Sequence, residues 1–129
     1  MSWLLIDTST RGKVRAGLLN PECTHLEEKD GRSHLLLSIL FQDIGLEAIQ
    51  RSEGICVVAG PGSFSAVRGG VLVANILARY FSLPLAEVSV DATLDLQKLA
   101  LQCSQAKIPV VAFVQPIYDA EPNITKMPV

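Results

Sequence analysis

The hydrophobic pattern of this sequence changes its period after the first quarter of the chain, and that change limits the folds available to it. Before the change, apolar residues form a short continuous run at 3–7 and alternate with polar residues at 13–19, as in β-strands. A third, more polar strand is expected at 23–29, and the turns Arg11-Gly12 and Asn20-Pro21 separate the three. This first part therefore predicts an antiparallel meander.

Helices and strands alternate in the rest of the sequence. Ser33 is a suitable N-cap for a helix that ends near Ile44, with Gly45 as its stop. The run 54–59 is apolar throughout, which is typical of a strand covered on both faces. The remaining predicted elements are a helix at 64–82, a strand at 85–88, a helix at 90–105 and a last apolar run at 108–114.

This order of elements predicts an α/β fold with a mixed five-stranded sheet and helices on its faces, because strand–helix–strand steps form right-handed parallel crossovers. The same order occurs in the ribonuclease H-like fold, which also forms each lobe of actin-like ATPases. The likeness of folds does not by itself indicate a function. We expect one ribonuclease H-like lobe over residues 1–106, followed by a residual strand and a proline-rich tail over 107–129.

Composition excludes several classes of protein. Among 129 residues, 11 Lys and Arg stand against 13 Asp and Glu, which argues against a strongly basic nucleic-acid binder but leaves room for a small local basic patch. Three cysteines without a CxxC motif predict free thiols in a reducing compartment. The sequence shows neither a signal peptide nor an apolar stretch of the roughly 18 residues that a membrane helix needs. We therefore expect a soluble cytoplasmic protein.

The first two predicted helices have more apolar surface than one contact with a sheet can bury. On a helical wheel the apolar residues of the first cover an arc of roughly 240°, whereas an ordinary surface helix needs a stripe only a little over 100° wide. In the second, Arg68, Asn75 and Arg79 form the only polar strip. Packing of the two helices side by side accounts for part of this surface, and the remainder predicts an interface with another molecule. The second helix also has small residues at every fourth position, against which another helix can pack closely: Ala66, Gly70, Ala74 and Ala78.

Two motifs of the sequence are candidates for a site of chemistry. The loop Gly60-Pro61-Gly62-Ser63 joins a strand to a helix N-terminus, where backbone N–H groups can bind an anion, but it lacks the lysine of a Walker A loop. A tight strand-to-helix connection is the favoured interpretation. Asp7 lies where a ribonuclease H-like enzyme has a metal ligand, yet no further carboxylates converge there from the neighbouring strand, so a structural turn is favoured. No metal site and no catalytic residue are predicted.

Residues 57–94 resemble the TsaB family, also called YeaZ, whose hallmark is GPGSFTGxR followed by a helix of small residues. The sequence IDTST at 6–10 is similar to the family's first strand, and 33–44 to its first helix. The chain departs from the hallmark at Ser65, Ala66 and Gly69, and it has only residues 106–129 where the family has a second lobe. The matching hallmark residues are Gly60, Pro61, Gly62, Ser63, Phe64, Val67 and Arg68, with Pro84, Val88, Ser89 and Leu94 beyond them.

The resemblance implies a non-catalytic subunit. Proteins of the TsaB family pair with a TsaD-type threonylcarbamoyl transferase, a TsaE-type ATPase joins them, and the assembly places threonylcarbamoyladenosine in tRNA. The family's first two helices form the interface with the transferase, and homodimers use the same surface. The resemblance implies no cofactor of its own, ATP or ADP only at a joint with a partner, tRNA contact only through the complex, and no membrane.

On these grounds we expect a scaffold that binds the transferase through its first two helices, with possible nucleotide contacts at Asp7, Thr8 and Ser9. Two alternatives stay open at this stage: an actin-like lobe that binds or hydrolyses nucleotide, and a homodimeric binding module with another role. The residues expected at the partner interface are Leu36, Leu37, Leu40, Phe41, Ile44, Ala66, Val67, Gly70, Val73, Ala74 and Leu77.

Overall fold

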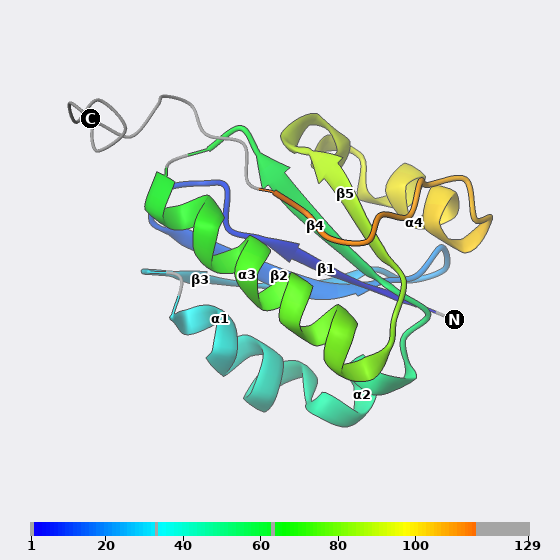
Figure 1. The fold of residues 1–129 in the computed structure, drawn as a ribbon, viewed down its shortest axis with the longest axis horizontal. Coiled ribbons are helices and arrows are strands. Elements are labelled where there is room, and N and C mark those ends of the chain that lie inside the picture. The colour runs from blue at the N-terminus through cyan, green and yellow to red at the C-terminus, as the bar shows by residue number, and fades with distance from the viewer. Residues whose placement is uncertain (1, 33, 63, 116–129) are drawn as a thin grey trace, which may run out of the picture.

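The structure is a computed structural model that describes residues 2–32, 34–62 and 64–115, with the backbone alone for 64–66. Three sequence predictions fall outside this part: the N-cap at Ser33, the hallmark residue Ser63, and the tail from 116 onward. The described residues form one mixed sheet of five strands in the order β3-β2-β1-β4-β5 (Figure 1). The predicted α/β class and its five-stranded mixed sheet are confirmed.

The first three strands form the predicted antiparallel meander. They are β1 (Trp3–Asp7), β2 (Lys13–Leu19) and β3 (His25–Asp30), and β2 pairs with both of its neighbours. The third strand begins two residues later than expected. In the β1–β2 register Asp7 lies opposite Arg15, a pairing that the alternation of apolar residues does not reveal.

The other half of the sheet is parallel. β4 (Ile55–Gly60) runs beside β1, and β5 (Leu85–Ser89) runs beside β4. Every residue of β4 is buried, as expected for a strand covered on both faces. Between these strands α3 (Phe64–Phe81) provides the crossover that the sequence predicts.

The first helical segment differs from the prediction of one α-helix to residue 44. One α-helical turn, α1 (Leu35–Ser38), continues as a π-helix, η1 (Ile39–Ile44). At its end the N–H of Gly45 donates to the carbonyl of Leu40, five residues earlier, at 2.9 Å. Gly45, at φ +91°, ends the segment as predicted. The short α2 (Leu46–Arg51) that follows was not predicted.

The predicted helix at 90–105 is also divided. A 3₁₀-helix, η2 (Val90–Leu94), precedes α4 (Leu96–Ser104), and Asp95 between them has the non-helical dihedrals φ −133° and ψ 89°. The Asp95 carboxylate accepts a hydrogen bond from the backbone N–H of Lys98 at 3.1 Å. Asp95 is therefore the N-cap of α4, because its carboxylate satisfies one of the free donors of the first turn.

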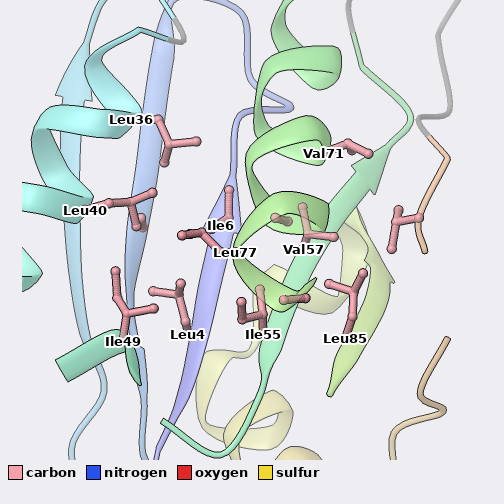
Figure 2. Close-up of a cluster of buried hydrophobic side chains, with 14 of the residues drawn as sticks. Leu4, Ile6, Leu36, Leu40, Ile49, Ile55, Val57, Val71, Leu77 and Leu85 are labelled. Atoms are coloured by element: carbon pink, nitrogen blue, oxygen red, sulfur yellow. The ribbon is translucent and has the colours of Figure 1, made fainter. Parts of the chain in front are cut away.

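The sheet separates two hydrophobic cores. Leu4 and Ile6 of β1 contribute to the larger core, beneath α1, η1, α2 and α3, and Figure 2 shows Leu36, Leu40 and Leu77 in it. Alternate residues of β1 face the smaller core beneath α4. None of the helices in the described part of the chain has the length and hydropathy needed to cross a bilayer.

The apolar run at 108–114 does not form the predicted strand. Its single β-bridge joins Val111 to Leu85, through a hydrogen bond from the Val111 N–H to the Leu85 carbonyl at 2.8 Å. Further along, the carboxamide of Asn75 on α3 accepts from the N–H of Val114 at 2.8 Å and donates to its carbonyl at 2.9 Å. Val114 is buried in the larger core, so this segment is fixed to α3.

Two leucines of the first helical segment, three residues apart, should differ in their effect on stability. Leu40 is fully buried, whereas Leu37 is 43% exposed. We expect Leu40→Ala to lower the free energy of unfolding by about 2–5 kcal/mol, because it leaves a cavity in the core. Leu37→Ala should lower it by less than about 1 kcal/mol. Urea denaturation followed by circular dichroism measures both, and equal losses would contradict this assignment of core and surface.

Candidate functional site

The hallmark loop lies at the carboxyl end of the two central parallel strands. It follows β4 directly, and the loop that follows β1, which starts with Thr8, packs against it. A Cβ placed on Gly62 would clash with the Val67 side chain and approach the carbonyl oxygen of Ser9 to 2.8 Å. Gly62 therefore permits a close contact between the two loops, as the interpretation of a tight connection predicts.

Asp7 forms a structural turn at the end of β1. One oxygen of its buried carboxylate accepts from the Ser9 backbone N–H at 2.9 Å and from the Ser9 hydroxyl at 2.6 Å. The other accepts from the guanidinium of Arg15. Both carboxylate oxygens are thus engaged within the chain, in line with the structural interpretation of this residue.

Thr8 and Ser9 are buried beside Asp7. Thr8 lies directly against α3, because a Cβ on Gly70 would collide with its hydroxyl oxygen and come within 3.0 Å of its methyl carbon. Of the three residues predicted as possible nucleotide contacts, Asp7 and Ser9 are therefore joined by hydrogen bonds, and Thr8 packs against α3.

The predicted interface set divides between the core and the surface. Six of its members are buried within this chain: Leu36, Leu40, Val67, Gly70, Ala74 and Leu77. The structure therefore corrects the sequence analysis for these residues. It also corrects the row of small residues, because Gly70, Ala74 and Ala78 bring α3 close to the sheet rather than to another helix. The side chain of Ala66 lies outside the described residues.

The other predicted residues lie at or near the surface. Leu37 and Phe41 are exposed, while Val73 and Ile44 are half-buried. On α3 the exposed apolar side chains are Leu72, Ile76 and Tyr80, none of which the sequence analysis included in the interface. We call the set Leu37, Phe41, Leu72, Val73 and Ile76 the outer apolar face.

A signal for the missing residues was present in the sequence. Leu72 and Ile76 each follow a small residue of the row by two positions, which is about 200° around a helix. Once the small residues are assigned to the sheet, Leu72 and Ile76 must point outward. The polar strip was predicted correctly: Arg68 and Arg79 are exposed, and Asn75 binds the segment that contains Val114.

The remaining candidates for chemistry are placed as follows. Among the residues that the structure describes, no three His, Cys, Asp or Glu side chains gather as metal ligands would. All three cysteines are free thiols, as predicted. A hydrogen bond to Cys103, together with burial, raises the pKa of Cys56, and the same bond lowers the pKa of Cys103. Both thiols are buried in the smaller core.

The ion pair at Asp7 should contribute much more to stability than an exposed pair. Asp7 is buried beneath Arg15, whereas Arg51 and Glu47 pair on the surface of α2. We expect Arg15→Met to cost about 3–5 kcal/mol of unfolding free energy, because it leaves a buried carboxylate without its cation. Arg51→Met should cost less than about 1 kcal/mol. Thermal denaturation at neutral pH compares the two, and a loss for Arg15→Met no larger than that for Arg51→Met would contradict this role of Asp7.

Comparisons with known proteins agree with this architecture. A structure of YeaZ from Pseudomonas aeruginosa superimposes with a TM-score of 0.60 at 24% identity. A second structure, described as an uncharacterized protein with similarity to peptidase YEAZ from Pseudomonas aeruginosa, gives the same values. Each match covers 68% of this chain and 43% of the solved chain, so this chain corresponds to less than half of those proteins. No curated protein matches the sequence.

The matched structures establish the fold, which is the ribonuclease H-like α/β fold of YeaZ. A family match extends over residues 34–115, from α1 to the segment fixed by Asn75, and so includes more than half of the chain. The outer apolar face lies entirely within the matched residues. The chain belongs to the family described as TsaD: tRNA N6-adenosine threonylcarbamoyltransferase.

Proposed function

We propose that this chain is a non-catalytic scaffold subunit that binds a TsaD-type threonylcarbamoyl transferase and supports threonylcarbamoyladenosine modification of tRNA. Membership of the family supports the link to tRNA modification. The fold of YeaZ supports the comparison with TsaB-type subunits. Because the chain spans less than half of the solved relatives, the activity of the whole assembly is part of the proposal.

The observation that carries the proposal is the outer apolar face. It comprises four exposed apolar side chains and the half-buried Val73, on two helical segments that cover the same face of the sheet. In Figure 1, α1 and α3 lie alongside each other on that face. Burying a leucine or isoleucine side chain contributes about 1.5–3 kcal/mol. Several such side chains at the centre of an interface are enough to hold a stable partner.

Among the residues that the structure describes, the other sides of α3 contact the sheet and the segment that contains Val114. Its small residues face the sheet, and its polar strip holds Val114 through Asn75. Leu72 and Ile76 are left facing outward on the side away from the sheet. We infer a helical interface in which the transferase contributes apolar helices of its own. In the absence of the transferase, a homodimer through the same face is the expected state.

The arrangement at Asp7 favours the scaffold over the alternative of a nucleotide-hydrolysing lobe. The carboxylate is engaged by Arg15 and Ser9, and Thr8 packs against Gly70. These contacts support a structural role for the β1 loop. A TsaE-type ATPase would join the assembly through the transferase, and any ATP or ADP would bind at a joint between subunits.

A charge in the outer apolar face should abolish assembly. Ile76 is 56% exposed on α3, so Ile76→Glu should leave the fold intact and weaken binding of the transferase by at least about a hundredfold, because the carboxylate would be buried without a partner. The measurement is co-purification with the transferase of the same source, followed by size-exclusion chromatography.

The matched control is Leu94→Glu, because Leu94 is a leucine that is 84% exposed on η2, outside the outer apolar face. It should co-purify as the unaltered chain does. The proposal fails if the unaltered chain does not associate with the transferase, or if Ile76→Glu and Leu94→Glu behave alike.

A further inference from the structure

Arg11 and Arg32 lie on two turns that a backbone hydrogen bond joins. The turns lie at the end of the sheet where β1 ends and α1 and α3 begin, an end that can be followed in Figure 1. The backbone N–H of Gly31 donates to the carbonyl of Gly12 at 2.8 Å, which ties the β1–β2 turn to the loop after β3. Arg11 precedes the first glycine and Arg32 follows the second, and both side chains are exposed. We call Arg11 and Arg32 the arginine pair.

Neighbouring carboxylates do not neutralise the arginine pair, because they have other cations. Asp7 binds Arg15, and Lys13 lies 3.4 Å from Glu28. Further contacts join Lys13 to Asp30 at 3.9 Å, Arg15 to Glu28 at 3.9 Å and Lys29 to Asp43 at 3.4 Å. Neither guanidinium group of the pair forms a hydrogen bond or ion pair with any residue that the structure describes. The end of the sheet therefore has two exposed guanidinium groups that pair with none of the described carboxylates.

The chemistry of this surface suits phosphodiester groups. A guanidinium group presents a planar set of donors that matches phosphate oxygens, and it stays charged at every physiological pH. Arg68, at the start of α3, is a third exposed arginine at the same end. Among the side chains that the structure describes, the exposed aromatic residues Phe41, Tyr80 and Phe113 lie in η1, in the last turn of α3 and in the last segment. A surface of this kind binds the RNA backbone without reading its bases.

We propose that the arginine pair binds the phosphate backbone of tRNA directly. The inference rests on the proposed function, which supplies tRNA as the substrate of the assembly, and it adds a direct contact with this subunit. The position of the arginine pair also supports this inference, because the helices α1 and α3, which carry the outer apolar face, begin at the same end of the sheet. A tRNA held by a transferase on that face would extend across the arginine pair.

The test is binding of a fluorescently labelled tRNA transcript to the purified full-length chain, followed by anisotropy between about 50 and 200 mM KCl. Arg11→Ala/Arg32→Ala should raise the Kd about tenfold at the lower salt concentration and reduce the slope of log K against log salt by about two. The matched control is Arg51→Ala/Arg79→Ala, which removes the same charge from exposed arginines elsewhere. It should change the Kd by less than about threefold.

Three results would overturn the inference. The first is that the unaltered chain shows no salt-dependent binding of tRNA. The second is that the two double variants weaken tRNA binding equally. The third is that Arg11→Ala/Arg32→Ala no longer binds the transferase but still binds tRNA, which would assign the arginine pair to an acidic protein surface. Co-purification with the transferase separates this inference from the proposed function. A chain that binds the transferase but not tRNA keeps the proposed function and loses the inference.

Discussion

The central strand β1 is buried along its whole length, and the rest of the structure depends on that burial. Its backbone pairs with β2 on one side and β4 on the other, so its side chains must be covered on both faces. Leu4 and Ile6 pack beneath α1, η1, α2 and α3 on one face of the sheet. Trp3 and Leu5 pack beneath α4 on the other face. The strand ends in a buried carboxylate, Asp7, whose charge requires a partner within the chain. The antiparallel register with β2 supplies it by setting Arg15 opposite.

The same constraint explains why one helix has several roles. α3 must approach the sheet closely enough to cover Thr8, which is why Gly70 faces that way. A second side carries Asn75, which fixes the segment that contains Val114. The third side, with Leu72 and Ile76, has no partner among the described residues. Surface of this kind on an otherwise well-packed domain is typical of a protein interface.

The strands were largely predictable because each is a short apolar or alternating run between turn residues, and their pairing followed from the order of elements. The helical details were not. The Leu40 carbonyl accepts from the N–H of Gly45, as in a π-helix, and not from that of residue 44, as in an α-helix. This choice depends on packing rather than on the local sequence pattern, so the sequence carries no signal for the π-helix. The break at Asp95 was readable in principle, since aspartate is a good N-cap, but the apolar residues on both sides masked it.

The candidate site was predictable as a helical surface and not as a set of residues. The sequence shows that the first two helices have excess apolar surface. Which of their side chains point outward depends on whether the small residues of α3 face a helix or the sheet, and the sequence permits both. The ion pair between Asp7 and Arg15 could be predicted only from the register of β1 and β2. The arginine pair could not be predicted from the sequence, because it depends on the hydrogen bond between Gly31 and Gly12, which joins two turns far apart in the chain.

The central claim is that the outer apolar face binds the transferase, and amide hydrogen exchange of the chain with and without that protein tests it most directly. The account predicts slower exchange, on complex formation, in η1 and in the outward-facing turns of α3 around Leu72 and Ile76, with α4 unchanged. Protection confined to α4 and η2, or no protection when the two proteins are mixed, would contradict it.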